Sequence, residues 1–378
     1  MLKNRLWIFH LSLITLIGLL TACNNHPIVA SQEATSLATA SPIATPTNTS
    51  TSPPPTPSPM PPSTPTATLI PTFTPSPTPV PTATSTPTPT PDLYAGLTIA
   101  DLVARSYGGG ELQIEEVLAV TDAFTRTLIS YPSEGLTLYG FMNTPEGGGS
   151  FPVALVMHGY IPPENYQTIA YTTRYADALA QAGYLVIHPN YRNYAPSAEG
   201  PDLFRVSHTV DALNLIAVIK AQAGRPGPLQ QADPTFIGMV GHSMGGGITL
   251  RTITVSGEVQ AAALYGAMSG DEQRNYEKIF EWSGGQRGLE ELNTPPEDLQ
   301  RISPIFYLDR INTAVSIHHG DNDGTVPLAW SLELCDQLQA LNKVVECFTY
   351  PGQPHTFQGE DDQLFIQRVI DFFNQIRG

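Results

Sequence analysis

The sequence predicts an α/β fold in which helices cover a mostly parallel, doubly wound sheet. From residue 152 onward, short apolar runs alternate with helix-compatible stretches of about 10 to 18 residues, which is the pattern of such a sheet. Two strands precede that region and would give the sheet an antiparallel N-terminal edge. One strand-to-helix junction, at residues 236–255, carries the sequence G-x-S-x-G.

Each element follows from a local pattern. Residues 93–107 are typical of a short helix, and three consecutive glycines end it. The residues around Thr127, Ile129 and Tyr131 alternate as in a half-buried strand, so strands are expected at 116–131 and 136–143. Continuous apolar runs predict buried strands at 152–157, 184–188, 236–240, 260–265, 314–318 and 344–350. Helices are expected at 173–181, 204–223, 247–255, 328–341 and 361–376.

Residues 267–310 interrupt this alternation. They carry charged and aromatic residues without a strand pattern, and the segment is long for a plain loop. We expect a small helical lid over the site, and the alternative is a surface excursion far from it. Four aromatic residues could line an acyl pocket or pack in the core: Tyr265, Tyr276, Phe280 and Trp282.

The G-x-S-x-G motif has Gly241, Ser243 and Gly245 in its fixed positions. Between a strand and a helix, it is typical of a nucleophile elbow, a sharp turn that lifts the serine hydroxyl above the sheet. Glycine suits the flanking positions because a Cβ would clash there. Taken alone, the motif is equally compatible with a glycine-rich turn capped by a serine.

A serine hydroxyl needs a base within hydrogen-bond reach, and the base needs an orienting acid. Ser243, Asp323 and His355 each follow a predicted strand, in the chain order that this kind of sheet uses. We expect His355 to accept the Ser243 proton and later to protonate the leaving group. Asp323 is expected to orient His355 and to stabilise its imidazolium.

The backbone N–H groups of Tyr160 and Met244 are expected to form an oxyanion hole beside that serine. The remaining histidines are interpreted as structural: His158, His188, His208, His242, His318 and His319. The sequence contains no H-E-x-x-H motif and no carboxylate cluster, so it predicts neither a metal nor a cofactor.

Four stretches together resemble the α/β-hydrolases: 158–160, 241–246, 319–327, and 350–352 with His355. From about residue 125 to 378, the chain looks most like the catalytic domains of the prolyl oligopeptidase family and the dienelactone hydrolase-like esterases. Their pattern H-G-x-x-D-x-x-V-P places the acid on Asp323, with Asp321 as the alternative. The pairs at 159–160 and 243–244 are also similar to those of cutinases. The resemblance implies an α/β-hydrolase fold and a serine hydrolase.

The resemblance leaves the substrate class open. Prolyl oligopeptidases carry a large β-propeller before the catalytic domain, whereas only a spacer and two strands stand there in this sequence. We therefore expect a carboxylic ester hydrolase, with a serine peptidase of that family as the alternative. A non-catalytic surface binding protein is the third interpretation, which the complete set of Ser, Asp and His disfavours. The expected partner is a small-molecule ester or a short peptide, and no oligomeric state is predicted.

The N-terminus has the features of a bacterial lipoprotein. Lys3 and Arg5 precede an uncharged apolar run at 6–20, which is short for a membrane-spanning helix and fits a signal peptide. The ending L-T-A-C resembles the lipobox, which implies cleavage before Cys23 and lipidation of its sulfur. The alternatives are an ordinary signal peptide and an uncleaved anchor. The predicted organisation is a signal at 1–22, a lipidated linker at 23–91 and a catalytic domain at 92–378.

The linker and the charge restrict the partners further. Of 36 prolines, 18 lie between Pro42 and Pro91, in a Pro/Thr/Ser-rich segment that cannot bury enough apolar surface to fold. We expect an extended spacer that holds an extracytoplasmic domain away from the bacterial cell membrane. The formal net charge of −16 becomes −18 without Lys3 and Arg5, and no basic cluster is present, so nucleic acid is excluded as a partner.

Three residues are left with two interpretations each. Cys335 and Cys347 could form a disulfide in an exported protein, or they could be two separately buried thiols. Arg192 follows a predicted strand, where it could contact substrate or form a structural ion pair.

Overall fold

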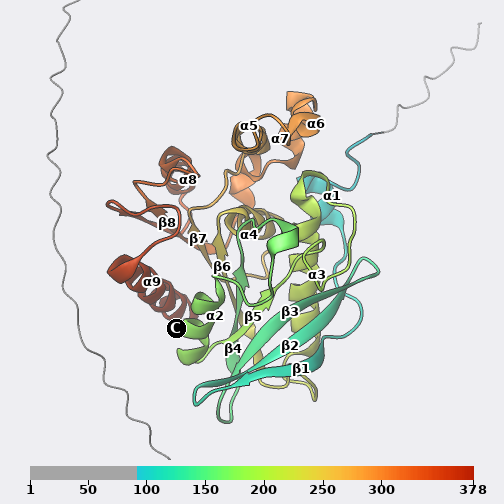
Figure 1. Ribbon diagram of the computed structural model, residues 1–378, viewed down its shortest axis with the longest axis vertical. Coiled ribbons are helices and arrows are strands. Elements are labelled where there is room, and N and C mark those ends of the chain that lie inside the picture. The colour runs from blue at the N-terminus through green and yellow to red at the C-terminus, as the bar shows by residue number, and fades with distance from the viewer. Residues whose placement is uncertain (1–91) are drawn as a thin grey trace, which may run out of the picture. The chain divides into compact units, whose positions relative to one another are not determined.

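The computed structural model describes residues 92–378, which contain one sheet of nine strands covered by helices (Figure 1). The strand order is β1-β2-β3-β5-β4-β6-β7-β8-β9. The predicted signal peptide, Cys23 and the linker lie outside the described residues. No helix within 92–378 is both long and apolar enough to cross a membrane.

The sheet has the predicted antiparallel edge and parallel centre. Strands β1, β2, β3 and β5 pair antiparallel in that order, and the pairs from β5 through β4 to β9 are parallel. The strands are β1 (Gln113–Val120), β2 (Phe124–Ser133), β3 (Leu136–Pro145), β4 (Phe151–Met157), β5 (Leu185–Pro189), β6 (Ala232–His242), β7 (Ala261–Tyr265), β8 (Ala314–Gly320) and β9 (Val345–Tyr350).

Helices pack on both faces of this sheet (Figure 1). Helices α2 and α9 share one apolar core with the sheet, and α3, α4 and α8 share the other. The helices are α1 (Ile99–Ala104), α2 (Thr173–Gln181), α3 (Val206–Gln222), α4 (Met244–Val255), α5 (Glu272–Trp282), α6 (Leu289–Leu292), α7 (Pro296–Ile302), α8 (Leu328–Ala340) and α9 (Gly359–Arg377). Short 3-10 segments lie at η1 (Pro163–Asn165), η2 (Leu203–Arg205) and η3 (Pro304–Arg310).

The central strands are apolar on both sides because both faces are covered. In β4, Val153 and Leu155 belong to the core under α3 and α4, while Ala154 and Val156 belong to the core under α2 and α9. This alternation follows from the two-residue period of a strand. It explains why the sequence shows continuous apolar runs here, and it confirms the predicted doubly wound sheet.

One predicted strand is wrong. The sequence suggested a single strand at 116–131, but the chain turns back at 121–123 and forms the hairpin β1–β2. The Thr121 hydroxyl oxygen accepts hydrogen bonds from the N–H groups of Ala123 (3.2 Å) and Phe124 (3.0 Å), which stabilises the turn. Because this turn contains neither glycine nor proline, the pattern of residues did not indicate it.

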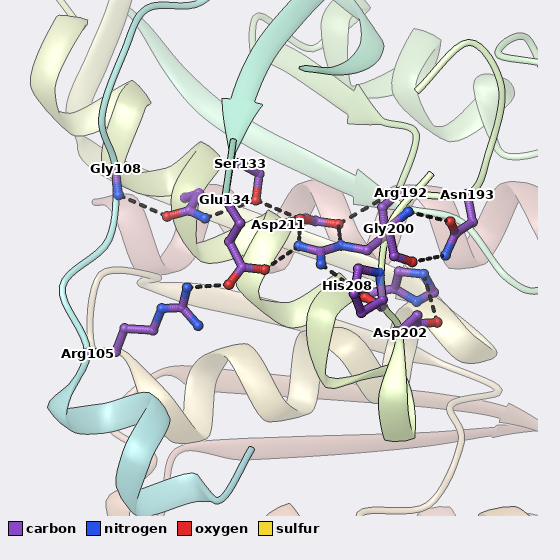
Figure 2. Close-up of polar contacts among 12 residues, drawn as sticks. Arg105, Gly108, Ser133, Glu134, Arg192, Asn193, Gly200, Asp202, His208 and Asp211 are labelled. Carbon is purple, nitrogen blue, oxygen red and sulfur yellow. Dashed lines mark hydrogen bonds and ion pairs between the residues drawn. The ribbon is translucent and has the colours of Figure 1, made fainter. Parts of the chain in front are cut away.

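A buried ion-pair network fastens the edge of the sheet to α3 (Figure 2). The guanidinium of Arg192, a residue only 2% exposed, donates to Asp211 at 2.6 and 3.0 Å and to Glu134 at 2.6 Å. The Ser133 hydroxyl also donates to Asp211, at 2.6 Å. Arg192 therefore holds the β2–β3 turn and the loop after β5 against α3, and it does not line the cavity described below.

The two cysteines of the C-terminal half are joined. Cys335 on α8 and Cys347 on β9 form a disulfide, with 6.4 Å between their Cα atoms. The structure therefore confirms the disulfide and not the alternative of two separately buried thiols.

Candidate active site

Ser243 lies in the turn between β6 and α4, with a φ of 57° and a ψ of −118°. A non-glycine residue in this region is strained and persists only where its surroundings hold it. The Ser243 N–H donates to the Tyr265 carbonyl at 2.9 Å, and the Ser243 carbonyl accepts from the Met268 N–H at 3.0 Å. The turn is thus fixed from both sides by the backbone around the end of β7.

The glycines of the motif are required by close backbone contacts. A Cβ on Gly241 would lie 2.3 Å from the carbonyl oxygen of Gly245. A Cβ on Gly245 would lie 2.2 Å from the carbonyl oxygen of Met157 on β4. Since backbone atoms form both contacts, no side-chain movement could relieve them, and the turn has the geometry of a nucleophile elbow.

The predicted acid and base contact each other. His355 follows β9, and its Nδ1 lies 2.7 Å from Oδ2 of Asp323, which follows β8. The Oδ1 atom of Asp323 accepts the N–H groups of Thr325 (2.8 Å) and Val326 (2.9 Å), so the carboxylate has a fixed orientation. The alternative acid, Asp321, instead accepts the N–H of Gly352 at 2.6 Å and serves a turn.

The charge of Asp323 is maintained by its hydrogen bonds. Burial alone would raise the pKa of this carboxyl group, but hydrogen bonds from His319 and His355 outweigh burial and hold its pKa well below the ordinary range. An ionised Asp323 accepts the Nδ1 proton of His355, which leaves Nε2 as the basic nitrogen.

His319 is a site residue that the sequence analysis missed. Its Nε2 lies 3.1 Å from Oδ2 of Asp323 and 3.0 Å from the carbonyl oxygen of Val326. Both neighbours are acceptors, so Nε2 carries a proton, while Nδ1 lies 2.7 Å from the Ser331 hydroxyl. The four-residue spacing between His319 and Asp323 was the available signal in the sequence, where His319 is interpreted as structural.

The loop after β4 lies directly beside Ser243, the predicted nucleophile. A Cβ on Gly159 would be 3.1 Å from the Cβ of Ser243. The Gly159 N–H donates to the Tyr171 hydroxyl oxygen at 3.1 Å and is therefore occupied. Within residues 92–378, the N–H groups of Tyr160 and Met244 have no acceptor, and these are the two groups expected to form the oxyanion hole.

A cavity of about 250 Å³ opens next to Ser243 and Met244. Segment 267–310 contributes α5, α6, α7 and η3, and five of its residues line this cavity. The lining residues are Tyr160, Arg205, Ser243, Met244, Met268, Ile279, Trp282, Ser283 and Arg287. Of the four aromatic residues considered from the sequence, only Trp282 is among them. Tyr265 and Tyr276 are buried in the core, whereas Phe280 is exposed at the surface.

The segment that covers the cavity is joined to the loop after β4. The Arg287 guanidinium lies over the ring of Tyr160, 4.8 Å from its centroid, and donates to the Tyr160 hydroxyl oxygen at 2.6 Å. Both residues line the cavity, so this contact forms part of its wall.

Comparison with known proteins identifies the class of this chain. Residues 211–378 match the prolyl oligopeptidase family, Peptidase_S9. A candidate carboxymethylenebutenolidase of Synechocystis sp. is 23% identical over 239 residues, covering 61% of this chain and 85% of that protein. The chain is a serine hydrolase. The uncharacterized peptidase YtmA of Bacillus subtilis is 25% identical to this serine hydrolase over 253 residues, covering 65% of the chain and 91% of YtmA.

Solved structures confirm that this serine hydrolase has the α/β-hydrolase fold. Acetyl xylan esterase 1 from Thermoanaerobacterium sp. aligns with a TM-score of 0.55 at 15% identity, covering 74% of this chain and 92% of the esterase. Acylaminoacyl peptidase from Pyrococcus horikoshii aligns with a TM-score of 0.52 at 21% identity, covering 67% of this chain. The alignment spans only 41% of that peptidase.

The Asp323–His355 contact gives a testable difference between two neighbouring carboxylates. We expect Asp323→Asn to lower kcat about 1,000- to 10,000-fold, because an amide cannot fix the required tautomer of the histidine. Asp321→Asn is the matched control, and its loss should stay below about tenfold, since Asp321 contacts only a turn. The measurement is kcat for ester hydrolysis by both variants. A larger loss of kcat in Asp321→Asn than in Asp323→Asn would assign the acid to Asp321.

Proposed function

We propose that this serine hydrolase is a carboxylic ester hydrolase that acts through an acyl-enzyme on Ser243. The observation that carries the proposal is the 2.7 Å contact between His355 and Asp323 beside a strained serine turn. A mostly apolar cavity, with two arginines in its wall, adjoins that turn and offers space for an acyl or alkyl group.

In the proposed reaction, His355 Nε2 takes the hydroxyl proton as Ser243 Oγ attacks the ester carbonyl carbon. The carbonyl oxygen becomes an oxyanion, which accepts hydrogen bonds from the N–H groups of Tyr160 and Met244. The C–O bond to the alcohol then breaks, and the imidazolium protonates the departing alkoxide. Water attacks the acyl-enzyme in a second cycle, with His355 again as base, and releases the carboxylic acid and free Ser243.

A serine peptidase for short peptides is the second candidate. The family match and the similarity to YtmA support it. We favour the ester hydrolase because the alignment spans 92% of acetyl xylan esterase 1 but only 41% of the acylaminoacyl peptidase. YtmA, which is covered to 91%, keeps the peptidase as the second candidate. A binding protein without activity is disfavoured, since the acid and base are in contact and the nucleophile lies in an elbow turn.

Hydrolysis of p-nitrophenyl esters, from acetate to decanoate, tests this proposal. We expect turnover with an optimum at short or medium acyl chains, because the cavity holds only about 250 Å³. Ser243→Ala should abolish it, since the variant lacks the hydroxyl that would form the acyl-enzyme. Turnover that persists in Ser243→Ala would refute the role of Ser243. Cleavage of a fluorogenic peptide panel without any ester turnover would support the peptidase instead.

Two arginines in the cavity bear on the charge of the substrate. Arg205 has a φ of 54°, a strained backbone conformation for a residue other than glycine. Within the described chain, its only carboxylate contact is with Glu272 at 3.5 Å. Glu272 also pairs with Arg251, and Arg287 pairs with no carboxylate of residues 92–378. The cavity therefore offers guanidinium donors that suit an acidic group on the substrate.

We expect the mono-p-nitrophenyl ester of glutaric acid to be hydrolysed faster than p-nitrophenyl hexanoate, which has a similar length but no charge. Arg287→Gln should lower the ratio of their kcat/KM values about tenfold, as for a lost charge-assisted hydrogen bond of about 1.5 kcal/mol. Arg225→Gln changes the net charge equally in the turn after α3, away from the cavity, and serves as control. A ratio that Arg287→Gln leaves unaltered would exclude this anion subsite.

We also propose that the enzyme is an extracytoplasmic lipoprotein, anchored in a bacterial cell membrane by a lipid on Cys23. The basic start, the apolar run and the L-T-A-C sequence support this. Expression of the full chain in a bacterium should place esterase activity in the membrane fraction, and Cys23→Ser should move it out of that fraction. Activity that remains in the membrane fraction with Cys23→Ser would rule out the lipid anchor.

A further inference from the structure

Three hydrogen bonds connect the loop that carries Tyr160 to the backbone of His355. The Gly159 N–H donates to the Tyr171 hydroxyl oxygen at 3.1 Å. That hydroxyl lies 2.5 Å from Nδ1 of His242. Nε2 of His242 lies 2.9 Å from the carbonyl oxygen of His355. The series therefore runs from the predicted oxyanion loop, past the nucleophile, to the predicted base.

The direction of every hydrogen bond in this series is fixed. The carbonyl oxygen of His355 only accepts, so Nε2 of His242 must carry the ring proton. Nδ1 is then an acceptor and takes the proton of the Tyr171 hydroxyl. The Tyr171 oxygen in turn accepts the Gly159 N–H. The Tyr171 hydroxyl and the His242 ring each accept one of these hydrogen bonds and donate the next, so no two of the three compete for a proton.

Burial keeps both side chains in these protonation states. Burial, together with repulsion from His355 when that ring is protonated, lowers the pKa of His242 to about 3, so the His242 ring stays neutral. Burial raises the pKa of Tyr171 to about 12, so its hydroxyl stays protonated. A neutral His242 is also needed because its ring lies 4.6 Å from that of His355, where a second positive charge would oppose the catalytic imidazolium.

The surroundings hold these two side chains in place. The Tyr171 carbonyl accepts from Arg174 at 2.8 Å, and Arg174 pairs with Asp362 on α9 at 2.9 Å. A Cβ on Gly159 would lie 2.6 Å from the Tyr171 hydroxyl oxygen, so glycine is needed for this close approach. The His242 ring packs against Tyr265, with 4.4 Å between centroids.

We propose that Tyr171 and His242 are positioning residues that keep the oxyanion loop and the general base at a fixed distance across Ser243. Neither side chain lines the cavity, so neither is expected to touch the substrate. The inference rests on the proposed roles of Ser243, His355 and Tyr160. Its consequence is that loss of either side chain lowers the rate of acylation without weakening substrate binding.

The test uses five variants of the full chain: Tyr171→Phe, His242→Phe, His242→Gln, the double variant Tyr171→Phe/His242→Phe, and Tyr184→Phe. Tyr184→Phe is the matched control, because it also removes a tyrosine hydroxyl that donates a hydrogen bond, here to Asn374 at 2.8 Å on α9. The measurements are kcat and KM for p-nitrophenyl butyrate, the rate of fluorophosphonate labelling of Ser243, and the melting temperature. Titration with the fluorophosphonate gives kcat per competent site, which separates misplacement from misfolding.

We expect Tyr171→Phe and His242→Phe each to lower kcat and the labelling rate about 10- to 100-fold, as for a small displacement of catalytic groups, with KM changed less than threefold. His242→Gln should recover much of the loss, because its amide can donate to the His355 carbonyl and accept from Tyr171. The double variant should lose little more than the worse single variant, since the residues act in series. Tyr184→Phe should keep kcat within twofold of the wild type.

Other results would overturn the inference. It fails if the single variants keep kcat per titrated site within twofold, or if the two losses multiply in the double variant. If the wild type reacts with the fluorophosphonate but hydrolyses no ester, the ester assignment fails, and the labelling rates still decide the positioning role. If the wild type does not react with the fluorophosphonate, both the proposed function and this inference fail.

Discussion

The left-handed backbone of Ser243 is the constraint on which the rest of the site depends. A serine with this φ lifts its hydroxyl away from the sheet and turns the Met244 N–H toward the same space. The conformation is unfavourable by itself, and the backbone hydrogen bonds of Ser243 to Tyr265 and Met268 hold it. Residues 241 and 245 must be glycine for the same reason, since neighbouring carbonyl oxygens occupy the space of a Cβ.

The parallel sheet brings distant parts of the sequence to this turn. Tyr160, Ser243, Asp323 and His355 follow β4, β6, β8 and β9, and the carboxyl ends of parallel strands lie at one edge of the sheet. The buried pair of Arg192 and Asp211 stabilises the antiparallel side instead. Burying such a pair requires good geometry, and the three oriented hydrogen bonds from Arg192 to Asp211 and Glu134 provide it.

Much of the fold and the main candidate residues could be predicted from the sequence. The strand at 152–157 and the turn at the glycine motif could be predicted because each depends on residues that are neighbours in the sequence. The hairpin at 121–123 was missed because a threonine hydroxyl, rather than glycine or proline, stabilises its turn. The contacts of His242 and Tyr171 could not be predicted, since each depends on a partner that only the folded chain brings near.

The segment between β7 and β8 supplies five of the residues that line the cavity, whereas the proposed nucleophile, acid and base follow other strands. Most of the cavity wall therefore comes from one segment of the sequence, while Tyr160, Arg205, Ser243 and Met244 supply the rest. Exchanging residues 267–310 between related enzymes could change which molecules are accepted while the reactive groups stay untouched. The contact between Arg287 and Tyr160 restricts which segments could be exchanged. A replacement segment would need a side chain at position 287 that packs against Tyr160.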